Sequence, residues 1–207
     1  MVELDVQMTL DGRLVVFHDD RLERTTNGTG RLIDTRYARL SRLDAGSWFH
    51  PRFAGERVLL VSQAVRFVPR RVRLNLELKR SPRRPALLRR LLRLARRRRL
   101  AQRILFSSFE PRLLRPLRSA GFPVALICRK AADRSLRQAA QLRCDAWHPF
   151  HALLTRRRIL KAHATGLRVH TWTVDDPKRA RQLVRWGVDG VFTNHPARLA
   201  RYFGTHS

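Results

Sequence analysis

The sequence predicts an α/β protein with a mainly parallel sheet, and three observations indicate this. From residue 72 onward, short apolar or β-branched runs alternate with amphipathic helical stretches. Successive runs start roughly 20–30 residues apart, the length of a strand, a helix and two short loops. Each run is apolar almost throughout, as expected for strands covered by helices. The runs are VRLNLEL (72–78), RILFSSF (103–109), PVALIC (123–128), CDAWHPF (144–150), LRVHTWTV (167–174) and DGVFTN (189–194).

The first third of the chain has a different pattern. MVELDVQMT and GRLVVFHD are two β runs separated by Leu10-Asp11-Gly12, and Asp-Gly is a strong signal for a tight turn. We therefore expect a β-hairpin, followed by an irregular inserted region at about residues 20–58.

Helix signals separate the later strands. In PALLRRLLRLARRRRL (85–100), leucines form one stripe and arginines fill the other face. Asp176 precedes Pro177, which predicts a helix that begins there, and Gly187 is expected to end it. Asp133 is expected to cap the helix of RSLRQAAQL.

The strand count leaves two architectures open. Seven parallel-type strands are expected, the six runs together with MVELDV. Seven units with right-handed crossovers suit an eight-fold barrel with one unit absent. A doubly wound open sheet suits the same count. The 207 residues suffice for a sizeable core, and we expect residues 1–207 to form a single domain.

The chain is strongly basic, with a formal charge of +28. Of its 44 basic residues only four are lysine, and the rest are arginine. Such a field attracts nucleic acid, acidic lipid or phosphate. However, the arginines are spread along the polar faces of expected helices, which GC-rich coding also produces. No RNP, zinc-finger or helix-turn-helix motif supports specific nucleic-acid binding.

The sequence also bears on the compartment. No run of about 18 uncharged apolar residues is present, so no transmembrane helix is expected. The N-terminus shows no charged region followed by an apolar one, as a signal peptide would. Cys128 and Cys144 make neither a disulfide framework nor a metal pair. These features favour a cytoplasmic protein and leave its oligomeric state open.

Several polar residues stand at or near the ends of expected strands. Glu3 and Asp5 are two apart on one strand, so both project from one face. Glu77 lies near the end of its strand, and Lys79 follows two residues later. In a barrel, such residues point into the catalytic mouth. Ser107 and Ser108 lack a G-x-S-x-G elbow, so no nucleophilic serine is expected. The other polar or aromatic residues at strand ends are His18, Ser107, Ser108, His148, Trp172 and Asn194.

Carboxylates that converge on one mouth repel each other unless a cation compensates them. Glu3, Asp5 and Glu77 are therefore candidate ligands for Mg²⁺ or Ca²⁺. His18 would stand beside them as a proton donor or acceptor, and Lys79 would face a phosphate oxygen. Each part also has a simpler interpretation: a solvated acidic pair, a turn histidine and a salt bridge on one strand face.

Longer strings of residues resemble the glycerophosphodiester phosphodiesterase family. They are VELDVQMTLDGRLVVFHDDRLERTTNGTG, LDAGSWF, NLELK and HTWTVDDP…GVDGVFTNHP, between residue 2 and about residue 196. The resemblance implies a TIM-type (β/α)8 barrel that lacks its first βα unit and carries a small insertion after the hairpin. It also implies metal-dependent hydrolysis of glycerophosphodiesters, which are small molecules, to sn-glycerol 3-phosphate and an alcohol.

The resemblance assigns roles to single residues. His18 matches one of the family's two catalytic histidines. Lys79 matches the active-site lysine, and Trp172 an apolar wall near the substrate. The family's ligands to a divalent cation match Glu3, Asp5 and Glu77.

The sequence departs from the family pattern at its start. The family opens with a strand that ends in His-Arg-Gly, then a Pro-Glu-Asn segment and a helix, and none of these occurs here. The second catalytic histidine and a phosphate-binding arginine are thus missing, and we expect a rate loss of roughly 10²–10⁴-fold from the histidine alone. Three hypotheses stay open: a truncated copy of an active phosphodiesterase, a degenerate relative that only binds phosphate ligands, and a basic polyanion-binding protein.

Overall fold

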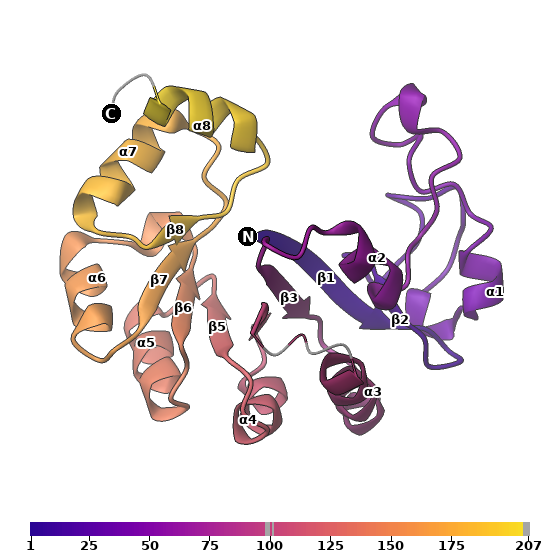
Figure 1. The fold of residues 1–207 in the computed structure, drawn as a ribbon, viewed down its shortest axis with the longest axis horizontal. Coiled ribbons are helices and arrows are strands. Elements are labelled where there is room, and N and C mark those ends of the chain that lie inside the picture. The colour runs from indigo at the N-terminus through magenta and orange to yellow at the C-terminus, as the bar shows by residue number, and fades with distance from the viewer. Residues whose placement is uncertain (98–99, 101, 205–207) are drawn as a thin grey trace. The chain divides into compact units, whose positions relative to one another are not determined.

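The computed structural model describes residues 1–97, 100 and 102–204. The chain forms two compact units, Met1–Phe122 and Pro123–Ser207 (Figure 1). Strands and helices alternate in each, so the predicted α/β class with parallel strands is confirmed. The single domain expected over residues 1–207 stays a prediction.

The first unit contains four strands in the order β2-β1-β3-β4. β1 and β2 form the predicted antiparallel hairpin, whereas β1, β3 and β4 are parallel. The tight turn depends on Gly12, which has a φ of 79° and donates its N–H to Thr9 O at 3.0 Å. The strands are β1 (Val2–Met8), β2 (Leu14–Val16), β3 (Leu74–Leu78) and β4 (Ile104–Ser108).

The helices of the first unit follow from apolar stripes. In α3, Leu87 and Leu91 are buried, while the arginines of the opposite face are exposed. At the start of α2, Gln63 Oε1 accepts the N–H of Leu60 at 2.8 Å. The helices are α1 (Tyr37–Leu40), α2 (Val61–Phe67), α3 (Arg84–Arg97) and α4 (Pro111–Ser119), with 3-10 turns at Leu32–Asp34 and Pro51–Phe53.

The inserted region after the hairpin has its own small core. Phe17, Leu22, Leu32, Leu40 and Val58 are buried together against β2. Burial of about five large apolar side chains gives this loop-rich segment a fixed conformation. It can therefore hold the residues that follow β2 in place.

The second unit contains four parallel strands in the order β5-β6-β7-β8. They are shorter than the apolar runs in the sequence, and the last has two residues. The strands are β5 (Val124–Cys128), β6 (Ala146–Pro149), β7 (Arg168–Thr171) and β8 (Gly190–Val191). The helices are α5 (Ala132–Gln141), α6 (Arg156–His163), α7 (Pro177–Trp186) and α8 (Pro196–Gly204), with a 3-10 turn at His151–Leu153.

Two cap predictions have opposite outcomes. Asp176 caps α7 as predicted, because its carboxylate accepts the N–H groups of Lys178 and Arg179, and Gly187 ends the helix with a φ of 98°. The prediction for Asp133 is wrong. That residue lies inside the first turn of α5, and its carboxylate instead accepts a hydrogen bond from an arginine of α6.

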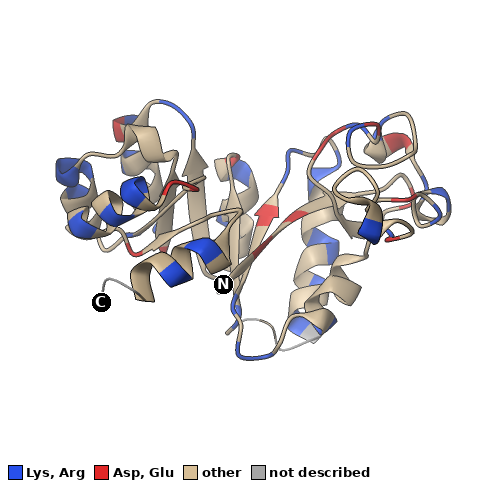
Figure 2. Ribbon diagram, turned by 90° about the horizontal axis from the view of Figure 1, so that it is seen from above, with Lys and Arg blue, Asp and Glu red and all other residues tan. Residues whose placement is uncertain are grey.

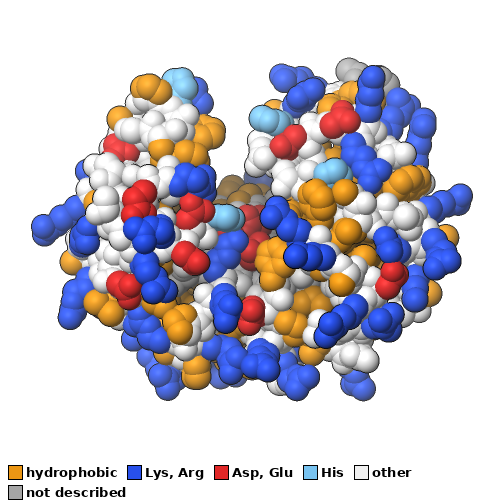
Figure 3. Space-filling view, turned by 180° about the vertical axis from the view of Figure 1, so that it is seen from behind, with side chains coloured by type: hydrophobic (Ala, Val, Ile, Leu, Met, Phe, Trp, Pro, Cys, Tyr) orange, Lys and Arg blue, Asp and Glu red, His pale blue; other side chains and the backbone are white. Residues whose placement is uncertain are grey.

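Charge is distributed unevenly between backbone elements. Figure 2 shows acidic segments on strands of the first unit and basic segments along the helices. Lys and Arg side chains are spread widely over the face that Figure 3 shows, on each unit. No helix in the described part of the chain is long and apolar enough to cross a membrane.

Candidate active site

The candidate site is built on one face of the sheet of the first unit. Asp5 of β1 lies opposite Glu77 of β3, and Glu3 lies opposite Asn75. Because side chains alternate along a strand, these four residues project from the same face. Carboxylate oxygens of Glu3, Asp5 and Glu77 lie within 4.8 Å of one another. The predicted convergence of these three residues is confirmed.

Lys79 lies directly beyond β3 and joins two of these carboxylates. Its Nζ is 2.8 Å from Asp5 Oδ1 and 2.5 Å from Glu77 Oε1. All three side chains are less than one-fifth exposed. The salt bridge considered as the simpler interpretation of the E-x-K pair is therefore present, and it spans two strands.

The proximity of these groups changes their protonation. Burial, followed by the charges of Asp5 and Glu77, raises the pKa of Glu3 from 4.5 to about 8. Burial also raises the pKa of Glu77, against the opposing effects of Lys79 and His18. Burial would lower the pKa of Lys79, but its bonds to the two carboxylates outweigh burial and raise it. One lysine thus compensates only part of the negative charge.

Polar atoms without partners gather on this same face. Glu3 Oε1, Asn75 Oδ1 and Ser107 Oγ are buried and make no hydrogen bond to any described residue. Ser107 lies opposite Glu77 in the sheet. Buried polar atoms are costly unless a ligand, ion or water satisfies them, so this face is suited to bind one. Oxygen donors at this spacing suit a hard divalent cation.

Asn75 was missed by the sequence reasoning. It lies two residues before Glu77 within an otherwise apolar strand, and that spacing was the available signal. Ser107 was recognised only as a residue at a strand end. Ser108, its neighbour, has a structural role, because its hydroxyl donates to Leu78 O at 2.8 Å.

His18 lies just after β2, the strand that pairs with β1 in the hairpin. The charge of His18 has the smallest of the effects on the pKa of Glu77, which it lowers. The side chain is 61% exposed, which leaves it accessible to a substrate. The amide of Gln7 donates to the carbonyls of Phe17, His18 and Asp19, at 3.2, 3.0 and 2.8 Å. This fixes the backbone that carries the histidine.

The imidazole of His18 is oriented by an acidic neighbour. Its Nδ1 is 2.5 Å from Asp19 Oδ1, which leaves Nε2 for other partners. Arg24 donates to both oxygens of Asp19, and mainly these bonds lower the pKa of that carboxyl to about 2. Asp19 is thus held as an anion, which suits a histidine that gains and loses protons.

Trp172 belongs to the second unit, where it forms an aromatic cluster. Its ring centroid is 5.5 Å from that of Phe150, and the Arg129 guanidinium lies 5.5 Å from it. Its Nε1 donates to His148 O at 2.8 Å. The remaining candidates of this unit have local partners: His148 is buried and contacts His170, and Asn194 donates to an aspartate.

Comparisons with known proteins show the family of this chain. The profile of the glycerophosphoryl diester phosphodiesterase family matches residues 1–198. The Bacillus subtilis protein YhdW is 33% identical over 201 residues, which cover 95% of this chain and 83% of that protein. A glycerophosphodiester phosphodiesterase of Caldanaerobacter subterraneus is 29% identical and is covered to the same extent.

Solved structures extend the likeness to the fold. A phosphodiesterase of Oleispira antarctica, in complex with its product sn-glycerol 3-phosphate, matches with a TM-score of 0.90 and 26% identity over 98% of this chain and 84% of that one. A glycerophosphodiester phosphodiesterase of Agrobacterium tumefaciens matches with a TM-score of 0.82 and 27% identity, over 96% and 85%.

The fold and the carboxylate face define a phosphodiesterase of the α/β class. The chain belongs to the glycerophosphoryl diester phosphodiesterase family. The choice that strand counting left open is thereby settled in favour of the TIM-barrel type.

Proposed function

We propose that this chain hydrolyses glycerophosphodiesters to sn-glycerol 3-phosphate and an alcohol, with a divalent cation held by Glu3, Asp5 and Glu77. The observation that carries the proposal is the meeting of these carboxylates within 4.8 Å. The product bound to the Oleispira antarctica relative supports the choice of substrate class.

The carboxylate face fits a cation in two respects. Glu3 has a buried oxygen with no partner among the described residues, and burial, followed by the negative charges of Asp5 and Glu77, raises its pKa. Mg²⁺ and Ca²⁺ both prefer oxygen ligands, so the donor set is compatible with either. A bound cation would supply Lewis-acid polarisation of the phosphate group.

The chain's own side chains then divide the remaining work. Lys79 holds a positive charge beside the carboxylates and is placed to attract a phosphate oxygen. His18 is oriented by Asp19 to exchange a proton through Nε2 with the attacking water or the leaving oxygen. The resemblance assigns Trp172 to an apolar wall near the substrate.

The experiment is an assay of glycerophosphocholine hydrolysis with Mg²⁺, with Ca²⁺ and with excess EDTA. We expect release of sn-glycerol 3-phosphate with a cation and loss of it with EDTA. Undiminished hydrolysis in EDTA would contradict the cation site. Glycerophosphocholine that binds without turnover would instead identify a degenerate relative.

The rate is a separate part of the proposal. Because the sequence contains no His-Arg-Gly, we expect slower turnover than in relatives that have it, by roughly 10²–10⁴-fold. A parallel assay of a relative whose sequence contains His-Arg-Gly provides the reference. Equal rates would contradict this part of the proposal.

A further inference from the structure

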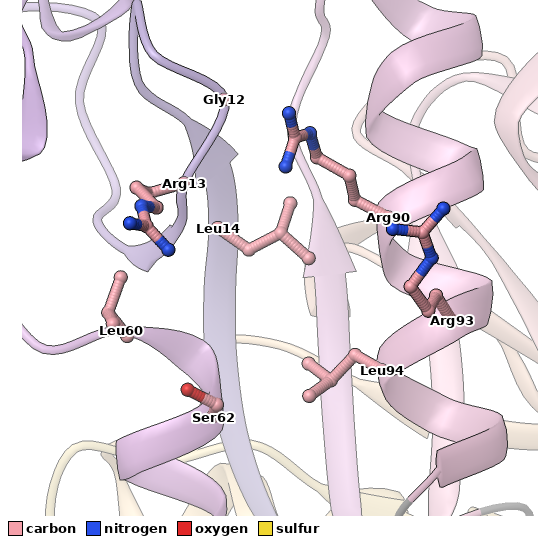
Figure 4. A pocket seen from close by; sticks show the side chains of 8 residues that line it. All are labelled: Gly12, Arg13, Leu14, Leu60, Ser62, Arg90, Arg93 and Leu94. Carbon is pink, nitrogen blue, oxygen red and sulfur yellow. The ribbon is translucent and has the colours of Figure 1, made fainter.

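A second charged site shares no residue with the carboxylate face. It is a groove of about 580 Å³ in the first unit, between the hairpin turn, the start of α2 and the middle of α3 (Figure 4). We call it the arginine groove. It is lined by Gly12, Arg13, Leu14, Leu60, Ser62, Arg90, Arg93 and Leu94.

The charge of the arginine groove is entirely positive. Arg13, Arg90 and Arg93 line it, and no carboxylate does. Within the described part of the chain, none of these three guanidinium groups forms an ion pair. The nearby Asp11 does not line the groove, and its Oδ1 accepts hydrogen bonds from Thr9 Oγ1 at 2.7 Å and Tyr37 N at 3.0 Å. Burial would raise the pKa of Asp11, but these bonds and, to a smaller extent, the charge of Arg13 outweigh burial and lower it.

The walls of the groove are fixed by contacts that need no ligand. Arg83, just before α3, donates to Leu10 O and Ile33 O, both at 2.7 Å, and so ties the hairpin turn to the helix. Arg90 lies against Gly12, where a Cβ would come within 2.7 Å of the Arg90 Nη2. A side chain at this position would displace the guanidinium, so the turn leaves room for Arg90.

The floor of the groove has a different character. Leu14, Leu60 and Leu94 contribute half-buried apolar surface. Figure 4 shows Leu14 in the middle, with Arg13, Leu60 and Ser62 on one side and Arg90, Arg93 and Leu94 on the α3 side. The Ser62 hydroxyl is the additional polar group of the lining. The groove therefore combines cationic walls with an apolar floor, which suits a ligand that has one anionic and one apolar part.

We propose that the arginine groove binds a phosphate monoester that carries a short apolar group. A phosphate dianion accepts hydrogen bonds from planar guanidinium groups, often two from one arginine. The volume is in the range typical of small-molecule sites. A soluble alkyl phosphate and the head group of phosphatidic acid offer this same chemistry.

The test compares two double variants that each remove two positive charges. R90Q/R93Q changes the groove, whereas R112Q/R115Q removes exposed arginines of α4 that do not line it. Butyl phosphate is titrated into each protein by calorimetry, in EDTA so that no cation contributes. We expect R90Q/R93Q to bind at least roughly tenfold more weakly and R112Q/R115Q to bind within about twofold of the unchanged protein.

A second arm identifies the source of the phosphate. Vesicles of phosphatidylcholine with and without phosphatidic acid are sedimented with the same three proteins. Binding to butyl phosphate assigns a soluble ligand, and binding only to phosphatidic acid vesicles assigns a lipid head group, provided that R90Q/R93Q abolishes it. Equal losses in both double variants, or no binding to either probe at millimolar concentration, would overturn the proposal. Thermal unfolding confirms that the variants are folded, and R13Q gives an independent third test of the groove.

Discussion

The carboxylate face and the arginine groove bind charge of opposite sign by different means. Glu3, Asp5 and Glu77 are partly buried on the face of a sheet, where one lysine compensates part of their charge. Arg13 and Arg90 are exposed on a turn and a helix. Both sites nevertheless hold like charges close together, which folding alone does not favour.

The difference shows what each site costs the protein. Burial makes the uncompensated carboxylates expensive, so a bound cation should stabilise the fold as well as supply chemistry. The guanidinium groups keep their water, so the arginine groove costs little stability when it is empty. Substitutions should therefore separate the two sites by their effects on activity, stability and binding.

The largest expected effect comes from Glu77→Gln on the carboxylate face. Loss of a candidate ligand, and of one ion pair with Lys79, should lower kcat/KM for glycerophosphocholine by about 10³-fold or more. The control is Glu56→Gln, an exposed glutamate of the inserted region. R90Q/R93Q should hydrolyse at the unchanged rate. Equal losses of kcat/KM in Glu77→Gln, Glu56→Gln and R90Q/R93Q would contradict the distinction between the two sites.

A smaller loss of activity is expected at His18. His18→Ala should reduce kcat by about 10²-fold through loss of proton transfer, and Asp19→Asn by roughly tenfold through loss of orientation. His163, paired with Asp189 at 2.9 Å on the second unit, provides a matched histidine–aspartate control. His163→Ala should leave kcat unchanged. If Asp19→Asn altered only KM, an orienting role for Asp19 would be wrong.

Sequence reasoning was most successful where strand periodicity fixes geometry. Glu3 and Asp5 had to share a face because they are two apart on a strand, and the strand with Glu77 was recognisable from its apolar run. The lack of hydrogen-bond partners at Asn75 Oδ1 and Ser107 Oγ could not be predicted. It depends on the register of the strands and on which polar groups lie next to these atoms.

The arginine groove was beyond sequence reasoning for a different reason. Arginines cover most helix faces in this chain, so Arg90 and Arg93 do not stand out from the others. Their significance depends on a turn almost 80 residues earlier, whose position is set by hydrogen bonds from the Arg83 side chain to backbone carbonyls. The cap prediction for Asp133 was wrong for a similar reason, because its carboxylate contacts Arg158 of another helix and does not cap its own.

The pH dependence of stability provides a further contrast. In EDTA, Glu3 keeps its proton in the folded protein up to about pH 8, whereas in the unfolded chain it loses the proton near 4.5. The free energy of unfolding should therefore fall between these values, by an amount on the order of a few kcal/mol, and level off above pH 8.

Urea unfolding at several pH values, with Glu3→Gln for comparison, measures this contribution. The comparison is needed because burial lowers the pKa of His148 well below 6.5, so that this residue makes stability rise with pH up to about 6.5. Only the difference in the free energy of unfolding between the unchanged protein and Glu3→Gln measures the contribution of Glu3. A difference that does not change with pH would contradict the prediction, and R90Q/R93Q should follow the unchanged protein.

The smallest expected effect is a difference in stability between variants of Arg83 and Arg90, two arginines that contact the hairpin turn. Arg83→Met removes two hydrogen bonds to backbone carbonyls and should lower the free energy of unfolding by about 1 kcal/mol. Arg90→Met removes no such bond and should leave stability within a few tenths of a kcal/mol. The affinity for butyl phosphate should show the reverse order, with the larger loss in Arg90→Met. Arg90 faces the groove, whereas Arg83 only positions its wall. Equal stability losses in Arg83→Met and Arg90→Met would show that Arg90, like Arg83, stabilises the fold. Arg90 would then not be available to a ligand of the groove.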